Sequence, residues 1–155
     1  MKPGQYFALI TGILFLAVGL MGFIPGFVRE PMTSPDAVGL GMGSGYGDLM
    51  GMFPINVLHN VVHIIVGLSG IFAAIALDGS RVFSRALAVF YGLLAIMGLV
   101  PGLNTTFGLI PIFGNDIWLH ALTAAIAFYF GFIASPGLLE LSSQQSQQFG
   151  GTSKS

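Results

Sequence analysis

Long apolar stretches alternate along the chain with short breaks rich in glycine, proline or polar residues. Four of these stretches approach the length of about 20 mostly apolar residues that a membrane-spanning helix needs. We predict helices near 5–25, 54–77, 83–101 and 116–134. The pattern therefore predicts an all-α integral membrane protein, a four-transmembrane-helix bundle forming a single domain over residues 1–135.

The residues at the ends of these stretches support the boundaries. The first and third stretches end in Pro-Gly, at 25–26 and 101–102, where proline cannot continue the helical hydrogen-bond ladder. The second begins at Pro54, a residue type suited to a first helical turn. Asn115 and Asp116 introduce the fourth, and their side chains could cap free N–H groups at the positive end of the helix dipole.

Similar segments in the two halves of the chain indicate an internal repeat. Residues 21–26 and 97–102 both read Met-Gly, two apolar residues, Pro-Gly, and Leu-His recurs at 58–59 and 119–120. Equivalent helices two spans apart run parallel, so we predict two tandem helical hairpins with pseudo-twofold symmetry about the membrane normal. This symmetry would place the two histidines at the same depth. Chance similarity of glycine-rich apolar segments is the alternative.

Small residues recur at helical spacing in each predicted span. Such residues let helix backbones approach closely in a bilayer, so they predict a compact bundle with the neighbouring polar side chains facing inward. The small-residue seams are Gly12, Gly19, Gly22 and Gly26; Gly67, Gly70 and Ala74; Ala88, Gly92, Ala95 and Gly98; and Ala124, Ala127 and Gly131.

Composition agrees with a membrane protein and argues against several other classes. Of the 155 residues, 54% are hydrophobic and 7% charged, whereas a soluble domain has about 25% charged residues. The net charge of −1 offers no basic face for nucleic acid. The glycine-rich loop 39–47 lacks the lysine of a phosphate-binding loop, so we expect no nucleotide. The tail 136–155 has no apolar periodicity and is predicted to be a disordered cytoplasmic end.

The distribution of basic residues predicts the orientation in the membrane. Four spans put the N-terminus, a loop at 78–82 and the C-terminus on one side, and Arg29 is the single basic residue on the other. By the positive-inside rule, both termini should be cytoplasmic. The basic residues on the cytoplasmic side are Lys2, Arg81, Arg85 and Lys154.

Five polar residues near the predicted spans are the candidates for chemistry: Asn56, His59, Asn60, His63 and His120. The first two histidines are four residues apart and share a helix face, and the repeat brings the third toward them. Three imidazoles could hold a divalent metal ion, or could serve as axial ligands of a tetrapyrrole such as haem or chlorophyll. A proton relay is a further possibility.

A purely structural role is the alternative for the same residues. Asn and His in membrane bundles often form interhelical hydrogen bonds worth about 0.6–2 kcal/mol. We assign Asn56, Asn60 and Asp116 to such a structural polar cluster. Residues 59–63 also have the outline of the zinc-protease pattern His-Glu-x-x-His, but Asn60 replaces the glutamate that acts as general base. With no other carboxylate expected within the spans, we predict no enzymatic activity.

The pattern Asn-x-x-His-Asn-x-x-His at 56–63, followed by Gly67 and Gly70, resembles the bacterial and cyanobacterial membrane proteins of domain-of-unknown-function family 4383. The resemblance covers roughly residues 5–135. It implies a four-helix, multi-pass protein of a bacterial inner membrane or a cyanobacterial thylakoid membrane, and it implies no established activity.

Two hypotheses for the function follow. The first is a non-enzymatic accessory or assembly subunit of a larger complex, with lipid and other membrane subunits as partners. The second is a cofactor protein that binds haem, chlorophyll or a metal through His59, His63 and His120. Migration as a free monomer in native gels would contradict the first hypothesis, and a colourless, metal-free protein would contradict the second.

Overall fold

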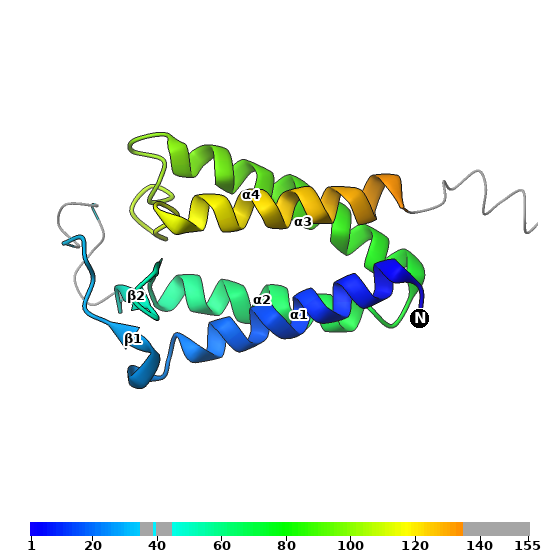
Figure 1. Ribbon diagram of the computed structural model, residues 1–155, viewed down its shortest axis with the longest axis horizontal. Coiled ribbons are helices and arrows are strands. Elements are labelled where there is room, and N and C mark those ends of the chain that lie inside the picture. The colour runs from blue at the N-terminus through cyan, green and yellow to red at the C-terminus, as the bar shows by residue number, and fades with distance from the viewer. Residues whose placement is uncertain (35–38, 40–44, 135–155) are drawn as a thin grey trace, which may run out of the picture.

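The computed structural model describes residues 1–34, 39 and 45–134, and its main elements are four helices that run back and forth along one long axis (Figure 1). The N-terminus and the α2–α3 connection lie at one end, here called the N-terminal end, and a small sheet lies at the other, here called the sheet end (Figure 1). The helices are α1 (Pro3–Met21), α2 (Val57–Ala73), α3 (Leu77–Leu99) and α4 (Asn115–Phe128), which continues into the π-helical segment η3 (Tyr129–Ile133).

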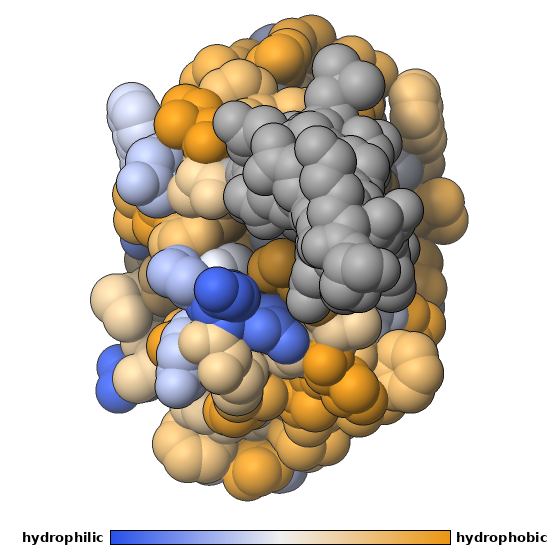
Figure 2. All heavy atoms as spheres, turned by 90° about the vertical axis from the view of Figure 1, so that its right-hand side faces the viewer, coloured by the Kyte–Doolittle hydropathy of each residue, from blue (hydrophilic) through white to orange (hydrophobic). Residues whose placement is uncertain are grey.

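Three segments are long and apolar enough to cross a membrane: Pro3–Met21, Leu77–Leu99 and Asn115–Ile133. Helix α2 is also apolar but shorter, at 17 residues. Seen from the N-terminal end, most of the surface is hydrophobic, and the hydrophilic residues lie near the middle and along one edge (Figure 2). The chain is therefore a multi-pass membrane protein, as its hydropathy predicts.

A three-stranded antiparallel sheet precedes α2, and this makes the all-α prediction incomplete. Its strands are β1 (Val28–Arg29), β2 (Gly47–Leu49) and β3 (Phe53–Ile55), in the order β1-β2-β3. Leu49 pairs with Val28 on one side and with Phe53 on the other. Most of the glycine-rich loop, residues 40–44, and the predicted disordered tail lie outside the described residues.

Two predicted boundaries are wrong. Pro54 lies in β3 rather than in a first helical turn, because the preceding segment pairs as a strand and α2 begins only at Val57. The predicted loop 78–82 belongs to α3, since residues 74–76 connect the two helices. Arg81 is consequently a buried helical residue, with Nη1 3.6 Å from Oδ1 of Asp78.

Helices α1 and α2 approach closely along the glycines of the first two small-residue seams. A Cβ atom added to Gly12 would lie 2.7 Å from the carbonyl oxygen of Gly67, and one added to Gly19 would lie 2.7 Å from that of Asn60. Neither position has room for a side chain. Gly26 takes no part in this contact, because it follows the end of α1 and is exposed.

Helix α3 packs mainly against α4, which completes two antiparallel hairpins. Near the N-terminal end, Nε of Arg85 donates a hydrogen bond to the carbonyl of Gly131 (2.8 Å), and its guanidinium carbon lies 5.2 Å from the ring centre of Phe132. The Leu-His repeat is not in register with the helix starts, since His59 is the third residue of α2 and His120 the sixth of α4. The pseudo-twofold axis stays a prediction.

Candidate functional site

The site begins at the N-terminus of α2, where Asn56 acts as the N-cap. Its backbone is extended, and its Oδ1 accepts the backbone N–H of His59 at 2.8 Å, a bond that satisfies one free donor of the first turn. Its Nδ2 donates to the carbonyl of Leu109 at 2.7 Å. One buried side chain thus ties the turn that carries His59 to the connection between α3 and α4.

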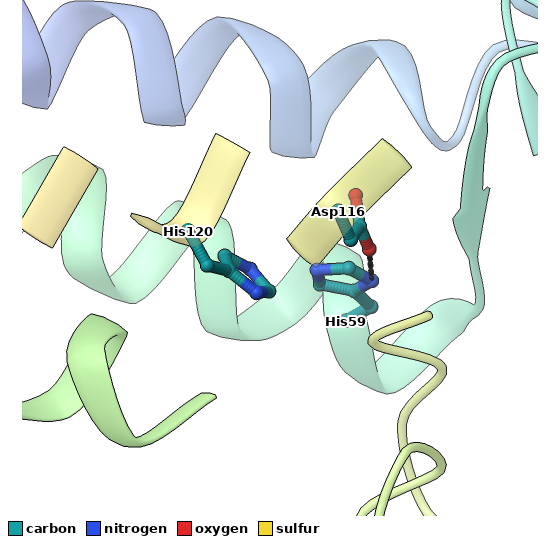
Figure 3. A group of neighbouring side chains, drawn as sticks. All are labelled: His59, Asp116 and His120. Carbon is teal, nitrogen blue, oxygen red and sulfur yellow. Dashed lines mark ion pairs between the residues drawn. The ribbon is translucent and has the colours of Figure 1, made fainter. Parts of the chain in front are cut away.

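The start of α4 differs from the predicted cap. The N-cap is Gly114, with φ 65° and ψ −129°, a backbone conformation that only glycine adopts readily. No side chain caps this helix, and Asn115 instead donates to the carbonyl of Met52 at 3.1 Å. Asp116 turns inward, with Oδ2 3.9 Å from Nδ1 of His59 (Figure 3). The capping role predicted for Asn115 and Asp116 is therefore wrong.

His59, Asp116 and His120 come together between α2 and α4 (Figure 3). Each offers one donor atom, and these atoms all lie within 4.8 Å of one another. Asp116 and His120 are four residues apart, so they project from the same face of α4. All three residues are at least 97% shielded from solvent, so the group is enclosed by the fold rather than exposed on its surface.

Several polar atoms of this region have no hydrogen-bond partner among the described residues. They are Nδ1 of His59, His63 and His120, and Oδ2 of Asp116. A buried polar atom without a partner costs about 1–3 kcal/mol, and a buried charge costs more. The cost is removed when the same atoms bind a ligand, which makes this cluster a candidate for ligand binding.

The remaining candidates lie around this group. The rings of His59 and His63 have their centres 4.5 Å apart, and His63 also stacks on Phe15 at 5.3 Å, outside the three-residue group. Asn60 is buried toward α1, where a Cβ atom on Gly22 would overlap its carboxamide. The geometry thus brings together two of the three histidines and adds a carboxylate that we had assigned to a structural role.

Sequence reasoning missed Asp116 as a candidate ligand and counted no carboxylate within the spans. The available signal was the spacing Asp-x-x-x-His over 116–120, which puts both side chains on one helix face, as for His59 and His63. The residue was instead interpreted as a helix cap because it opens the span. The expectation that the spans contain no carboxylate is therefore wrong, because Asp116 is a buried residue of α4.

A cavity of about 70 Å³ borders the group. It is lined mainly by apolar and aromatic side chains, together with His59, His63 and His120. Pockets for drug-sized ligands occupy roughly 300–1,000 Å³, so this space does not fit a haem or chlorophyll ring. A single metal ion with a small additional ligand fits it.

Comparison with known proteins places the chain in a family. The family model described as "Domain of unknown function (DUF4383)" matches residues 5–133. The chain belongs to this family. The DUF4383 match includes α2, α3 and α4 and every residue of the candidate site. No curated protein and no solved structure matches the chain.

Proposed function

We propose that this DUF4383 protein is a four-span membrane protein that binds one divalent first-row transition metal ion between α2 and α4. The ligands are His59, Asp116 and His120. The observation that carries the proposal is the convergence of their three buried donor atoms within 4.8 Å of one another. His59 comes from α2 and the other two ligands come from α4, so the ion would also link the two hairpins.

The chemistry of the donors supports such an ion. Two imidazoles and one carboxylate form a ligand set that suits zinc and non-haem iron. With bonds of about 2.0–2.2 Å, donor atoms around one ion lie roughly 3.3–3.5 Å apart. The separation of 3.9 Å between Nδ1 of His59 and Oδ2 of Asp116 is close to that range. Since the three donor atoms lie within 4.8 Å of one another, they would have to draw together by up to about 1.3–1.5 Å to bind one ion.

Metal analysis of the purified protein tests the proposal. The protein is extracted in mild detergent, stripped with a chelator, dialysed against Zn²⁺ and analysed by mass spectrometry for bound metal. We expect one ion per chain. Asp116→Asn and His120→Ala should lose affinity by more than the roughly 10–100-fold that removal of an outer-shell partner costs, because each removes a direct ligand.

Ser84→Ala is the matched control, because Ser84 is a fully buried polar residue of α3 that is not in the three-residue group. It should bind Zn²⁺ like the wild type. The metal site would be refuted if the wild-type protein, after dialysis against Zn²⁺, eluted as a folded, monodisperse species that contained no bound Zn²⁺. Equal Zn²⁺ binding by Asp116→Asn would refute the role of the carboxylate.

The fourth span and the orientation belong to the same proposal. Helices α1 and α3 both start at the N-terminal end, so α2 must return through the bundle between them (Figure 1). Its 17 residues give a length of about 26 Å, near the lower limit for a span. The positive-inside rule then favours cytoplasmic termini. We expect a phosphatase fused at the C-terminus to be inactive and a cytoplasmic reporter at the same position to be active; the reverse result would overturn the orientation.

The accessory-subunit hypothesis stays a prediction beside this one. A metal that fastens two hairpins is compatible with a subunit that docks on others, so the two hypotheses are not exclusive. The metal site is the more specific of the two, since it rests on named atoms.

A further inference from the structure

We propose that the metal ion keeps one exchangeable coordination position, directed into the cavity and occupied by water or a small anion that His63 holds by a hydrogen bond. This inference rests on the proposed metal site. The ligand class of the centre is then water or a small anion. His63 would bind this ligand by a hydrogen bond instead of binding the metal as a fourth ligand.

The number of donors leaves a position open. Among the described residues, the group of potential ligands has three members, and a divalent zinc ion takes at least four. Protein sites with three ligands of this kind, two His and one carboxylate, generally complete their coordination with water or substrate. A centre closed by protein alone would need a fourth protein donor within bonding distance of the ion.

The cavity supplies the space for that additional ligand. Two of the three metal ligands, His59 and His120, form part of its wall, whereas Asp116 does not. An ion held among the three side chains therefore has the carboxylate on one side and the cavity on the other. The volume of about 70 Å³ admits a few water molecules or an anion of a few heavy atoms, and excludes larger organic ligands.

Besides the two metal ligands, the cavity wall contains the polar side chains of His63, Tyr91 and Thr106, and we assign the additional ligand to His63. It lies one helical turn beyond His59, it is buried, and its Nδ1 has no hydrogen-bond partner among the described residues. Phe15 stacks on its ring and limits its rotation. A water or anion on the metal would give this imidazole the partner that the protein does not supply.

The surroundings keep bulk water away from the position. Thr106, Ile110 and Ile112, from the connection between α3 and α4, cover part of the cavity, and Asn56 holds that connection through Leu109. A metal-bound water in such an enclosed site is more acidic than bulk water, because the ion stabilises the hydroxide. The enclosed site therefore admits small ligands, which replace one another at the single open position on the ion.

Cobalt substitution tests the inference directly. The stripped, full-length protein is loaded with Co²⁺ alone, and its visible d–d absorption is recorded while sodium azide is added. We expect a saturable change in the spectrum as azide replaces the bound water. In His63→Leu, Co²⁺ should bind at the wild-type stoichiometry and azide should bind about tenfold more weakly, because a hydrogen bond to a charged ligand is lost. His63→Gln should recover part of the affinity.

Val61→Ala is the matched control, since Val61 is an exposed apolar residue of the same helix that does not line the cavity, and azide should bind to this variant as to the wild type. A Co²⁺ spectrum that azide does not alter would show a closed site and overturn the inference while leaving the metal site intact. Failure of the wild type to bind Co²⁺ would instead refute the proposed function itself. Unchanged azide affinity in both His63 variants would overturn the role of His63.

Discussion

Gly67→Ala should separate α1 from α2 and leave little correctly folded protein, although it adds only one methyl group. A Cβ atom at this position would lie 2.8 Å from both the carbonyl oxygen of Gly12 and the Cα of Leu16. Both obstacles are backbone atoms of α1, so no side chain can rotate to make room. The helices must move apart, and overpacking of this kind typically costs about 1–3 kcal/mol or more.

Gly92→Ala provides the matched control, because Gly92 also lies inside an apolar helix but has a Cβ-sized space beside it. The nearest atom to an added methyl group would be Cβ of Ala124, at 3.9 Å, an ordinary contact distance. Alanine favours a helix over glycine by up to about 1 kcal/mol, so this variant should be as stable as the wild type or more so. The temperature at which each purified variant loses its monodisperse peak in size-exclusion chromatography measures the difference. Equal midpoints for the two variants would contradict the close packing of the first hairpin.

The contrast between these glycines also shows how far sequence reasoning reaches. Small residues at helical spacing predict a compact bundle without saying which helices meet, and in the structure α1 and α2 approach closely along theirs. The same spacing includes Gly92, where no comparable contact forms. A seam of small residues indicates where backbones can approach, whereas the crossing of the helices decides where they do.

Hydropathy predicted the helices well because burial in lipid requires long apolar segments, but it could not predict the sheet. Its strands have two or three residues each, too few for a period-two pattern, and they form by pairing segments on both sides of a long loop. The start of α2 shows two local rules in competition. Pro54 suits a first helical turn and Asn56 suits an N-cap; the structure follows the second rule because Pro54 belongs to a strand.

The candidate site was predicted only in part, because it combines side chains from two helices. Spacing within one helix placed His59 and His63 together, but which side chain of α4 meets them depends on the rotation and height of that helix. In the structure Gly114 sets the start of α4, so that Asp116 and His120 both face inward. Neither the rotation nor the height of α4 can be derived from periodicity alone.

Asn56→Ala should be the most damaging polar substitution near the site. It removes the N-cap of α2, worth about 1 kcal/mol, and it removes the part-buried hydrogen bond to the carbonyl of Leu109, worth about 0.5–1.5 kcal/mol. We therefore expect the free energy of unfolding to fall by about 1.5–2.5 kcal/mol, the sum of these two contributions. Zn²⁺ affinity should fall as well, because the turn that carries His59 loses its anchor. Detergent-denaturation curves and Zn²⁺ titrations measure the two effects.

Two further variants separate the contributions of Asn56. Serine is a good N-cap but is too short to reach Leu109, so Asn56→Ser should lose only the hydrogen bond to Leu109, about 0.5–1.5 kcal/mol. Asn115→Ala removes a hydrogen bond of the same kind, from Nδ2 to the carbonyl of Met52, at an exposed position. Because water can replace an exposed partner, its cost should be below about 1 kcal/mol. Similar losses for Asn56→Ala and Asn115→Ala would show that Asn56 does not link α2 to the α3–α4 connection in the membrane. The enclosure of the proposed metal site would then need another explanation.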